Sequence, residues 1–256
     1  MTSSRVSDPS LIVAGLLAAG MLTAPAFAGP PFRTDDPVPT DFQHFEIYLF
    51  SEGEKATDGW AGTLPGLEVN YGALPNLQLS VTVGQGYAAP VGGRTSFAFE
   101  DVLLGAKYRF ITPGEDDWFP QVAFYPAVLV PTGNQKFGFS SGHVQYFLPL
   151  WLQKDFGPWT VYGGGGYWIN PGAGNKNYGV AGVAVWRKIG EQLSIGAEIF
   201  HETLPATGAK DSTGFNVGAI YDFSENWHLL GSAGTGLRNR PETNQFSYYL
   251  GVLQTF

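Results

Sequence analysis

The pattern that most constrains this chain is a period-two alternation of apolar and polar side chains, which recurs from Phe42 to Phe256. Successive side chains of a β-strand point to opposite faces, so this alternation predicts strands with one apolar and one polar face. No segment of this region has a convincing helical period, and none approaches the roughly 18 uninterrupted apolar residues that a membrane helix needs. Any contact with a bilayer must therefore be made by strands.

Connections of two kinds join the expected strands. We expect strands over residues 42–51, 63–73, 77–86, 97–110, 119–130, 142–154, 159–169, 177–187, 192–203, 213–223, 227–237 and 245–256. Turn-like connections at 74–76, 111–118, 155–158, 188–191 and 224–226 alternate with glycine-rich, polar ones at 52–62, 87–96, 131–141, 170–176, 204–212 and 238–244. Membrane barrels have short periplasmic turns and longer outer loops. The pattern predicts an all-β, transmembrane, antiparallel up-and-down β-barrel of about 12 strands.

The polar face of each strand is assigned to the lumen, because lipid cannot solvate a charge whereas a barrel interior can hold water. Such inward charges have two interpretations: they neutralise one another around water or a plug, or they bias which solute enters. The lumen or solute-binding candidates on this parity are Glu46, Glu68, Asp101, Lys107, Arg109, Arg187 and Glu198.

Composition agrees with a membrane barrel, since only 14% of the residues are charged, against ~25% in typical soluble domains. Tryptophans cluster at the expected short-turn ends, where a periplasmic aromatic girdle belongs. A soluble β-sandwich is the alternative, although it would more often bury such rings. The girdle candidates are Trp118, Trp159, Trp186 and Trp227, with Phe110, Phe119, Phe156 and Phe223.

The first 28 residues indicate export. Leu11–Leu22 is an uncharged apolar run, and Ala26 and Ala28 form a small-x-small cleavage pattern, so residues 1–28 are expected to be a cleaved signal peptide. The expected location is the outer membrane of a Gram-negative bacterium, in contact with its lipid. The net charge of −8 argues against a nucleic-acid partner, and the chain has no cysteine for a disulfide or thiolate metal site.

The last expected strand carries an assembly signal. Phe246, Tyr248, Leu250, Val252 and Phe256 share one parity, which is typical of outer-membrane proteins handed to the barrel-assembly machinery through a terminal aromatic strand. Gln254 interrupts this apolar face. We expect that machinery to be a partner.

A short motif follows the expected cleavage site. Arg33-Thr34-Asp35-Asp36-Pro37, followed by a strand that begins near Phe42, resembles the start of a family of outer-membrane transporter-like barrels named for the MetA pathway of phenol degradation. The repeated strands and the terminal Phe256 extend the resemblance over the expected mature chain. The resemblance implies passage of small, aromatic or apolar compounds.

Catalysis and metal binding find little support. None of the four histidines is followed by serine two residues later, as in outer-membrane phospholipases, and strand alternation would point His201 and Glu202 to opposite faces. We expect no enzyme activity, catalytic residue, cofactor or metal. A channel for small solutes is the leading hypothesis, with a structural or adhesive barrel of closed lumen second and a lipid-modifying enzyme third.

The segment 29–41 precedes the first expected strand on the periplasmic side and is rich in proline and polar residues. Thirteen residues, at up to roughly 3.3 Å each, reach far into a barrel if they turn inward. The segment is then either a plug or a disordered tether. As a plug it would bring Arg33, Asp35 and Asp36 into the lumen, with the two aspartates near Lys107, Arg109 and Arg187.

Overall fold

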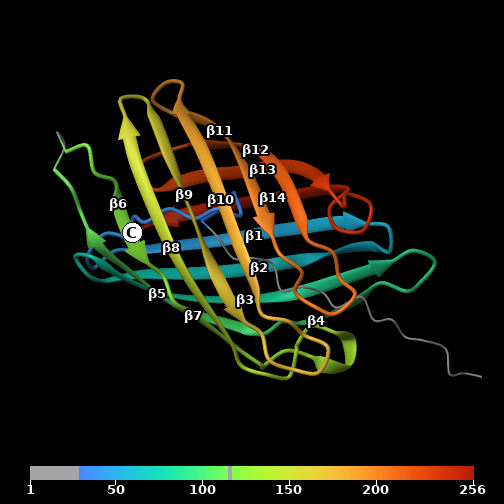
Figure 1. Ribbon diagram of the computed structural model, residues 1–256. Coiled ribbons are helices and arrows are strands. Elements are labelled where there is room, and N and C mark those ends of the chain that lie inside the picture. The colour runs from blue at the N-terminus through green and yellow to red at the C-terminus, as the bar shows by residue number, and fades with distance from the viewer. Residues whose placement is uncertain (1–28, 115–116) are drawn as a thin grey trace, which may run out of the picture.

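The barrel wall is a closed antiparallel sheet of 12 spans, in which the first strand pairs with the last (Figure 1). This computed structural model describes residues 29–114 and 117–256, and the expected signal peptide, 1–28, lies outside the described residues. No helix of the described part is long and apolar enough to cross a membrane. The strand segments are β1 (Phe45–Ala56), β2 (Gly59–Leu74), β3 (Leu77–Pro90), β4 (Ser96–Phe99), β5 (Val102–Ile111), β6 (Gln121–Phe124), β7 (Ala127–Val130), β8 (Gln145–Phe156), β9 (Trp159–Ile169), β10 (Tyr178–Lys188), β11 (Leu193–Glu202), β12 (Ser212–Asp222), β13 (Trp227–Arg238) and β14 (Phe246–Thr255), and a 3-10 turn, η1 (Gln135–Phe137), lies in one loop.

Two of the twelve spans are each broken into two segments. β4 and β5 together form one span, because both pair with β3, and β6 and β7 form the next, because both pair with β5 and β8. The second break falls at Tyr125 and Pro126. Proline has no backbone N–H to continue the ladder, which accounts for the interruption there.

The short-turn and long-loop asymmetry is confirmed at nine of eleven connections. The exceptions are the connection between β5 and β6, an expected short turn that covers nine residues, 112–120, and the connection between β1 and β2. The prediction placed an outer loop over 52–62, whereas β1 runs to Ala56 and β2 begins at Gly59, which leaves a two-residue hairpin. The outward-facing side chains of this stretch, Ser51 and Lys55, are not apolar, so the alternation that marks a strand is missing from the sequence although the backbone pairs.

The outer surface of the barrel is apolar, as a lipid-facing wall requires. Seven of the eight girdle candidates are exposed, and Trp186 is the correction: it is buried inside the barrel. Arg187, its neighbour, was expected to face the lumen but is exposed on the outer surface, where its guanidinium lies 5.1 Å from the ring centroid of Trp159. It shares the parity of Val183 and Val185, which are also exposed.

The interior has an apolar side and a polar side. Aromatic rings from β8, β9 and β10 stack there, with ring centroids 4.7 Å apart for Phe147 and Trp168 and 6.0 Å apart for Trp168 and Tyr178. Opposite, β2 and β3 contribute buried polar side chains, among them Glu68, Asn70 and Gln78. The space that remains inside the barrel is therefore bordered by polar side chains on one side and by apolar ones on the other.

Candidate functional site

The segment 29–41 lies inside the barrel and makes the candidate site together with the inner wall. Phe32, Thr34, Asp35, Pro37 and Thr40 are all buried, although none of them belongs to a strand. In Figure 1 the segment is the deep-blue trace that runs among the strands before β1. The contacts described below fix it to both the apolar and the polar side of the interior.

Glu198, on β11, holds the backbone of the segment. Its carboxylate accepts hydrogen bonds from the backbone N–H groups of Arg33 at 2.9 Å and Thr34 at 2.8 Å, and from the Thr34 hydroxyl at 2.7 Å. The side-chain amide of Asn216 donates a further bond at 2.6 Å. Hydrogen bonds to an ionised acceptor are roughly twice as strong as neutral ones, and Glu198 is only 3% exposed.

Lys107, on β5, binds the segment from across the lumen. Its ammonium lies 3.0 Å from one carboxylate oxygen of Asp35 and 4.0 Å from a carboxylate oxygen of Asp36. Burial raises the pKa of the Asp35 carboxyl to about 6, and the nearby Lys107 ammonium opposes that rise. Asp36 is less buried, and its carboxylate also accepts a hydrogen bond from the backbone of Val38 at 2.7 Å.

Two further polar contacts fix the ends of the segment. The Gln78 side-chain oxygen, on β3, accepts hydrogen bonds from the Thr40 backbone at 2.8 Å and from its hydroxyl at 3.1 Å. The Ser232 hydroxyl, on β13, donates to the Pro31 carbonyl at 2.5 Å. These hydrogen bonds and the ion pair alone hold residues 31 to 40 to four strands, β3, β5, β11 and β13.

Apolar packing adds to these bonds. The ring of Phe32 lies 4.7 Å from that of Trp186, centroid to centroid, in a buried cluster with Tyr162 and Ala184. This contact explains why Trp186 points inward, because the segment makes the lumen locally dry. A glycine, Gly218, leaves room for the ring: a Cβ at that position would lie 2.8 Å from Phe32 Cε1.

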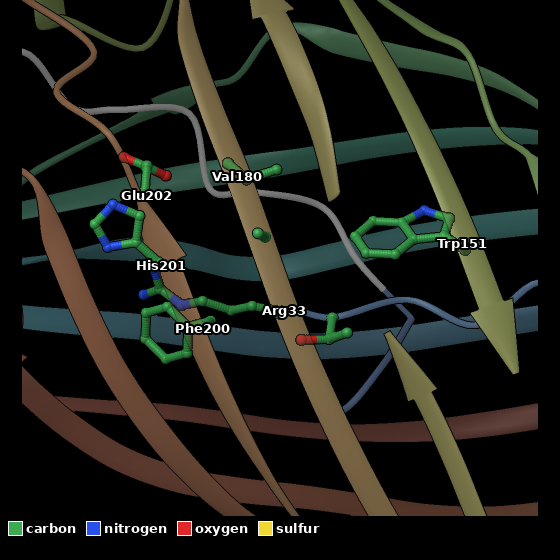
Figure 2. A pocket seen from close by; sticks show the side chains of 9 residues that line it. Arg33, Trp151, Val180, Phe200, His201 and Glu202 are labelled. Atoms are coloured by element: carbon green, nitrogen blue, oxygen red, sulfur yellow. The ribbon is translucent and has the colours of Figure 1, made fainter. Parts of the chain in front are cut away.

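Arg33 turns away from the rest of the motif into a small cavity of about 20 Å³. Figure 2 shows its side chain reaching toward Phe200, with Glu202 nearby and Trp151 farther away on the other side. The guanidinium lies 4.6 Å from the ring centroid of Phe200 and pairs with Glu54. Arg33 is therefore held by both a ring face and a carboxylate.

Two other predicted lumen residues, Asp101 and Arg109, do not contact the charged side chains of the segment. Asp101 accepts a hydrogen bond from the backbone of Gly133 at 2.9 Å and so fastens the loop after β7, while Arg109 donates to the Gln121 side chain at 2.8 Å. Of the three cations expected near Asp35 and Asp36, Lys107 alone reaches them, because Arg109 is bonded elsewhere and Arg187 points outward.

A larger cavity, which we call the lumen cavity, lies between the segment and the inner wall of the barrel, with both polar and apolar side chains in its lining. Its volume is about 220 Å³. Glu46 on β1 and Glu68 on β2, both predicted lumen residues, line it together with Asp35, Asp36 and Lys107. Sequence parity identified Glu46, Glu68 and Lys107 as inward, and the plug hypothesis brought Asp35 and Asp36 into the lumen, but the sequence had no signal for the cavity, which the segment helps to line.

Catalytic and metal chemistry find no matching arrangement in the described residues. No group of three or more His, Cys, Asp or Glu side chains there is placed to hold a metal ion. His201 Nδ1 lies 2.8 Å from the Thr213 hydroxyl, yet within 29–114 and 117–256 no carboxylate is hydrogen-bonded to that imidazole, as a base that activates a nucleophile requires.

Comparison with known proteins gives the fold. No protein-family model and no curated protein matches the sequence, so the resemblance to the family named for the MetA pathway is not confirmed. Solved outer-membrane barrels do match. An outer-membrane channel from Pseudomonas putida F1 superposes with a TM-score of 0.69 at 16% identity, covering 86% of this chain and 98% of that one.

Two further structures extend the comparison. The KdgM porin in complex with disordered oligogalacturonate gives a TM-score of 0.57 at 14% identity, covering 82% of this chain and 99% of that one. The translocator domain of the autotransporter NalP from Neisseria meningitidis gives 0.55 at 15% identity, covering 85% and 90%. The class is thus an outer-membrane β-barrel fold of 12 strands.

Proposed function

We propose that this protein is an outer-membrane channel for small molecules in which the segment 29–41 is a plug. The observation that carries the proposal is the Glu198 carboxylate, which binds two consecutive backbone N–H groups and one hydroxyl of the segment inside the barrel. A disordered tether is expected to stay in water, because ordering its backbone inside the barrel costs about 1–2 kcal/mol per residue.

The chemistry of the contacts suits a plug that is released and redocked. The segment is attached by hydrogen bonds, one buried ion pair and one aromatic cluster, and it is not part of the wall's hydrogen-bond ladder. Its release therefore leaves the closed sheet intact. The fold shared with a channel and a porin supports this function, and the passage of small aromatic or apolar compounds remains part of the proposal.

Conductance in planar bilayers tests the proposal. The chain beginning at residue 29 is compared with one beginning at residue 42, after both have been shown to fold by circular dichroism and by heat-modifiable migration in gels. We expect the deletion to raise single-channel conductance or the open fraction, and to speed liposome swelling in small neutral solutes.

The two rival functions give different results in the same experiment. A tether at 29–41 leaves conductance unchanged by the deletion. A structural or adhesive barrel with a closed lumen gives no current and no solute uptake with either chain. In that case the lumen is closed by the barrel itself, so removing the segment opens no path.

A further inference from the structure

The lumen cavity has two chemically different walls. Its polar wall includes Glu46, Glu68 and Asn70, whereas Leu103 and Phe147 lie on its apolar wall. A cavity of about 220 Å³ with an acidic side and an apolar side matches a small amphipathic solute better than it matches water alone.

The acidic wall has more negative charge than its neighbours neutralise. Glu68 is 9% exposed, and its carboxylate accepts from the Asn70 amide at 3.0 Å and the Thr82 hydroxyl at 3.4 Å, both of which are neutral groups. Glu46 accepts from the Tyr48 hydroxyl at 3.2 Å. Within the described part of the chain neither glutamate forms a salt bridge, and Lys107 is bonded to Asp35.

An unused acceptor stands beside these carboxylates. Asn70 lines the lumen cavity and is 4% exposed, yet its Oδ1 atom has no hydrogen-bond partner. A buried polar atom without a partner is destabilising, and a buried carboxylate without a cation is more so. A solute that brings hydrogen-bond donors and a positive charge removes both costs.

We propose that the lumen cavity binds a small organic cation, whose ammonium group is held by Glu46, Glu68 and Asn70 and whose apolar body packs against Leu103 and Phe147. The inference deepens the proposed channel function, on which it rests, by naming the class of solute. An organic cation is favoured over a metal ion because no group of three or more ligating His, Cys, Asp or Glu side chains is assembled in the described residues.

Calorimetric titration of the detergent-solubilised chain from residue 29 tests the proposal with three probes of similar shape. Benzylammonium carries the positive charge, benzyl alcohol is neutral and phenylacetate is negative. We expect benzylammonium to bind and phenylacetate not to bind. Because a charged hydrogen bond contributes about 1.5–3 kcal/mol, Glu68→Gln is expected to weaken benzylammonium about tenfold or more.

A matched variant separates the site from overall charge. Glu191→Gln removes the same charge in an exposed turn and is expected to leave binding unchanged. Glu46→Gln removes the other carboxylate of the proposed site and is also expected to weaken benzylammonium binding, so the proposal stays testable if Glu68→Gln does not fold. Equal binding of benzylammonium and phenylacetate, or wild-type affinity in both cavity variants, overturns it.

Failure of this inference is distinguishable from failure of the channel function. If the deletion of 29–41 raises conductance while benzylammonium does not bind, the channel stands and the cation site falls. If benzylammonium binds but neither chain conducts, the site stands in a barrel that is not a channel.

Discussion

The carboxylate of Glu198 and the hydroxyl of Thr34 are 2.7 Å apart, although 164 residues separate them in the chain. The same oxygen also accepts from the Thr34 backbone N–H, so one side chain of β11 fixes both the position and the orientation of the segment. A contact between a wall strand and a segment outside the sheet has no role in closing the barrel. It holds the segment to the wall and takes no part in pairing the strands.

Replacing Glu198 tests this contact directly. Glu198→Gln keeps the shape of the side chain but removes the charge, and its amide turns a donor toward groups that also donate. Because each charged hydrogen bond contributes ~1.5–3 kcal/mol, we expect the open fraction in planar bilayers to rise about tenfold or more. Glu191→Gln is the control of equal charge in an exposed turn, and an open fraction that is the same in both variants contradicts the prediction.

The ion pair between Lys107 and Asp35 gives a second prediction. Removing one partner of a buried pair leaves an uncompensated charge and costs about 3–5 kcal/mol, whereas replacing both partners is often neutral. We therefore expect Lys107→Met to raise the open fraction strongly, and Lys107→Met with Asp35→Asn to restore most of the closed state. Recordings of the two variants decide the matter: if the double variant is as open as the single one, the pair does not hold the plug.

Acidification is expected to favour the docked plug in Lys107→Met, where Asp35 is buried without its counter-charge. Burial raises the pKa of docked Asp35 to about 6 even beside Lys107, whose ammonium opposes the rise, compared with about 3.9 for an exposed aspartate. In that variant the docked state therefore binds the proton more tightly, so its advantage is complete below about pH 4 and is lost as the pH rises above 6.

The measurement is the open fraction at pH 7.5 and pH 5. We expect a lower open fraction at pH 5 than at pH 7.5 in Lys107→Met, where Asp35 has lost its counter-charge. The double variant, Lys107→Met with Asp35→Asn, has no proton to bind at this position and serves as the control. A pH response of the same size in the double variant assigns the effect to other carboxylates and contradicts the role of Asp35.

The sequence predicted the closed antiparallel barrel because lipid imposes a strict alternation along most strands. It failed where lipid does not act. The outer end of β1, around Ser51 and Lys55, has no apolar side to recognise, so the strand was interpreted as a loop. Trp186 and Arg187 were misplaced for a related reason: parity assumes a polar lumen, and Phe32 makes the lumen apolar at that point.

For the candidate site, parity identified Glu46, Glu68, Lys107 and Glu198 as inward-facing side chains, and composition drew attention to Arg33, Asp35 and Asp36. The sequence did not predict which of these side chains contact one another, since those contacts depend on how deep the segment enters the barrel and which way it turns. Gln78 lies on the inward parity of its strand, but nothing in the local pattern links it to Thr40.

Gly182, on β10, supplies the last prediction, because it is the place where the wall makes room for Thr34. A Cβ atom at Gly182 would collide with Thr34 Oγ1, so Gly182→Ala is expected to displace the segment and weaken the bonds to Glu198. Gly179, on the same strand, is the matched control, since a Cβ there meets its nearest atom, the Gly166 carbonyl oxygen, at an ordinary 3.8 Å. We expect a raised open fraction in Gly182→Ala, wild-type behaviour in Gly179→Ala, and no effect of Gly182→Ala once residues 29–41 have been deleted. An increase that persists in the deletion background would mean that the substitution deforms the wall itself and that Thr34 does not depend on this glycine.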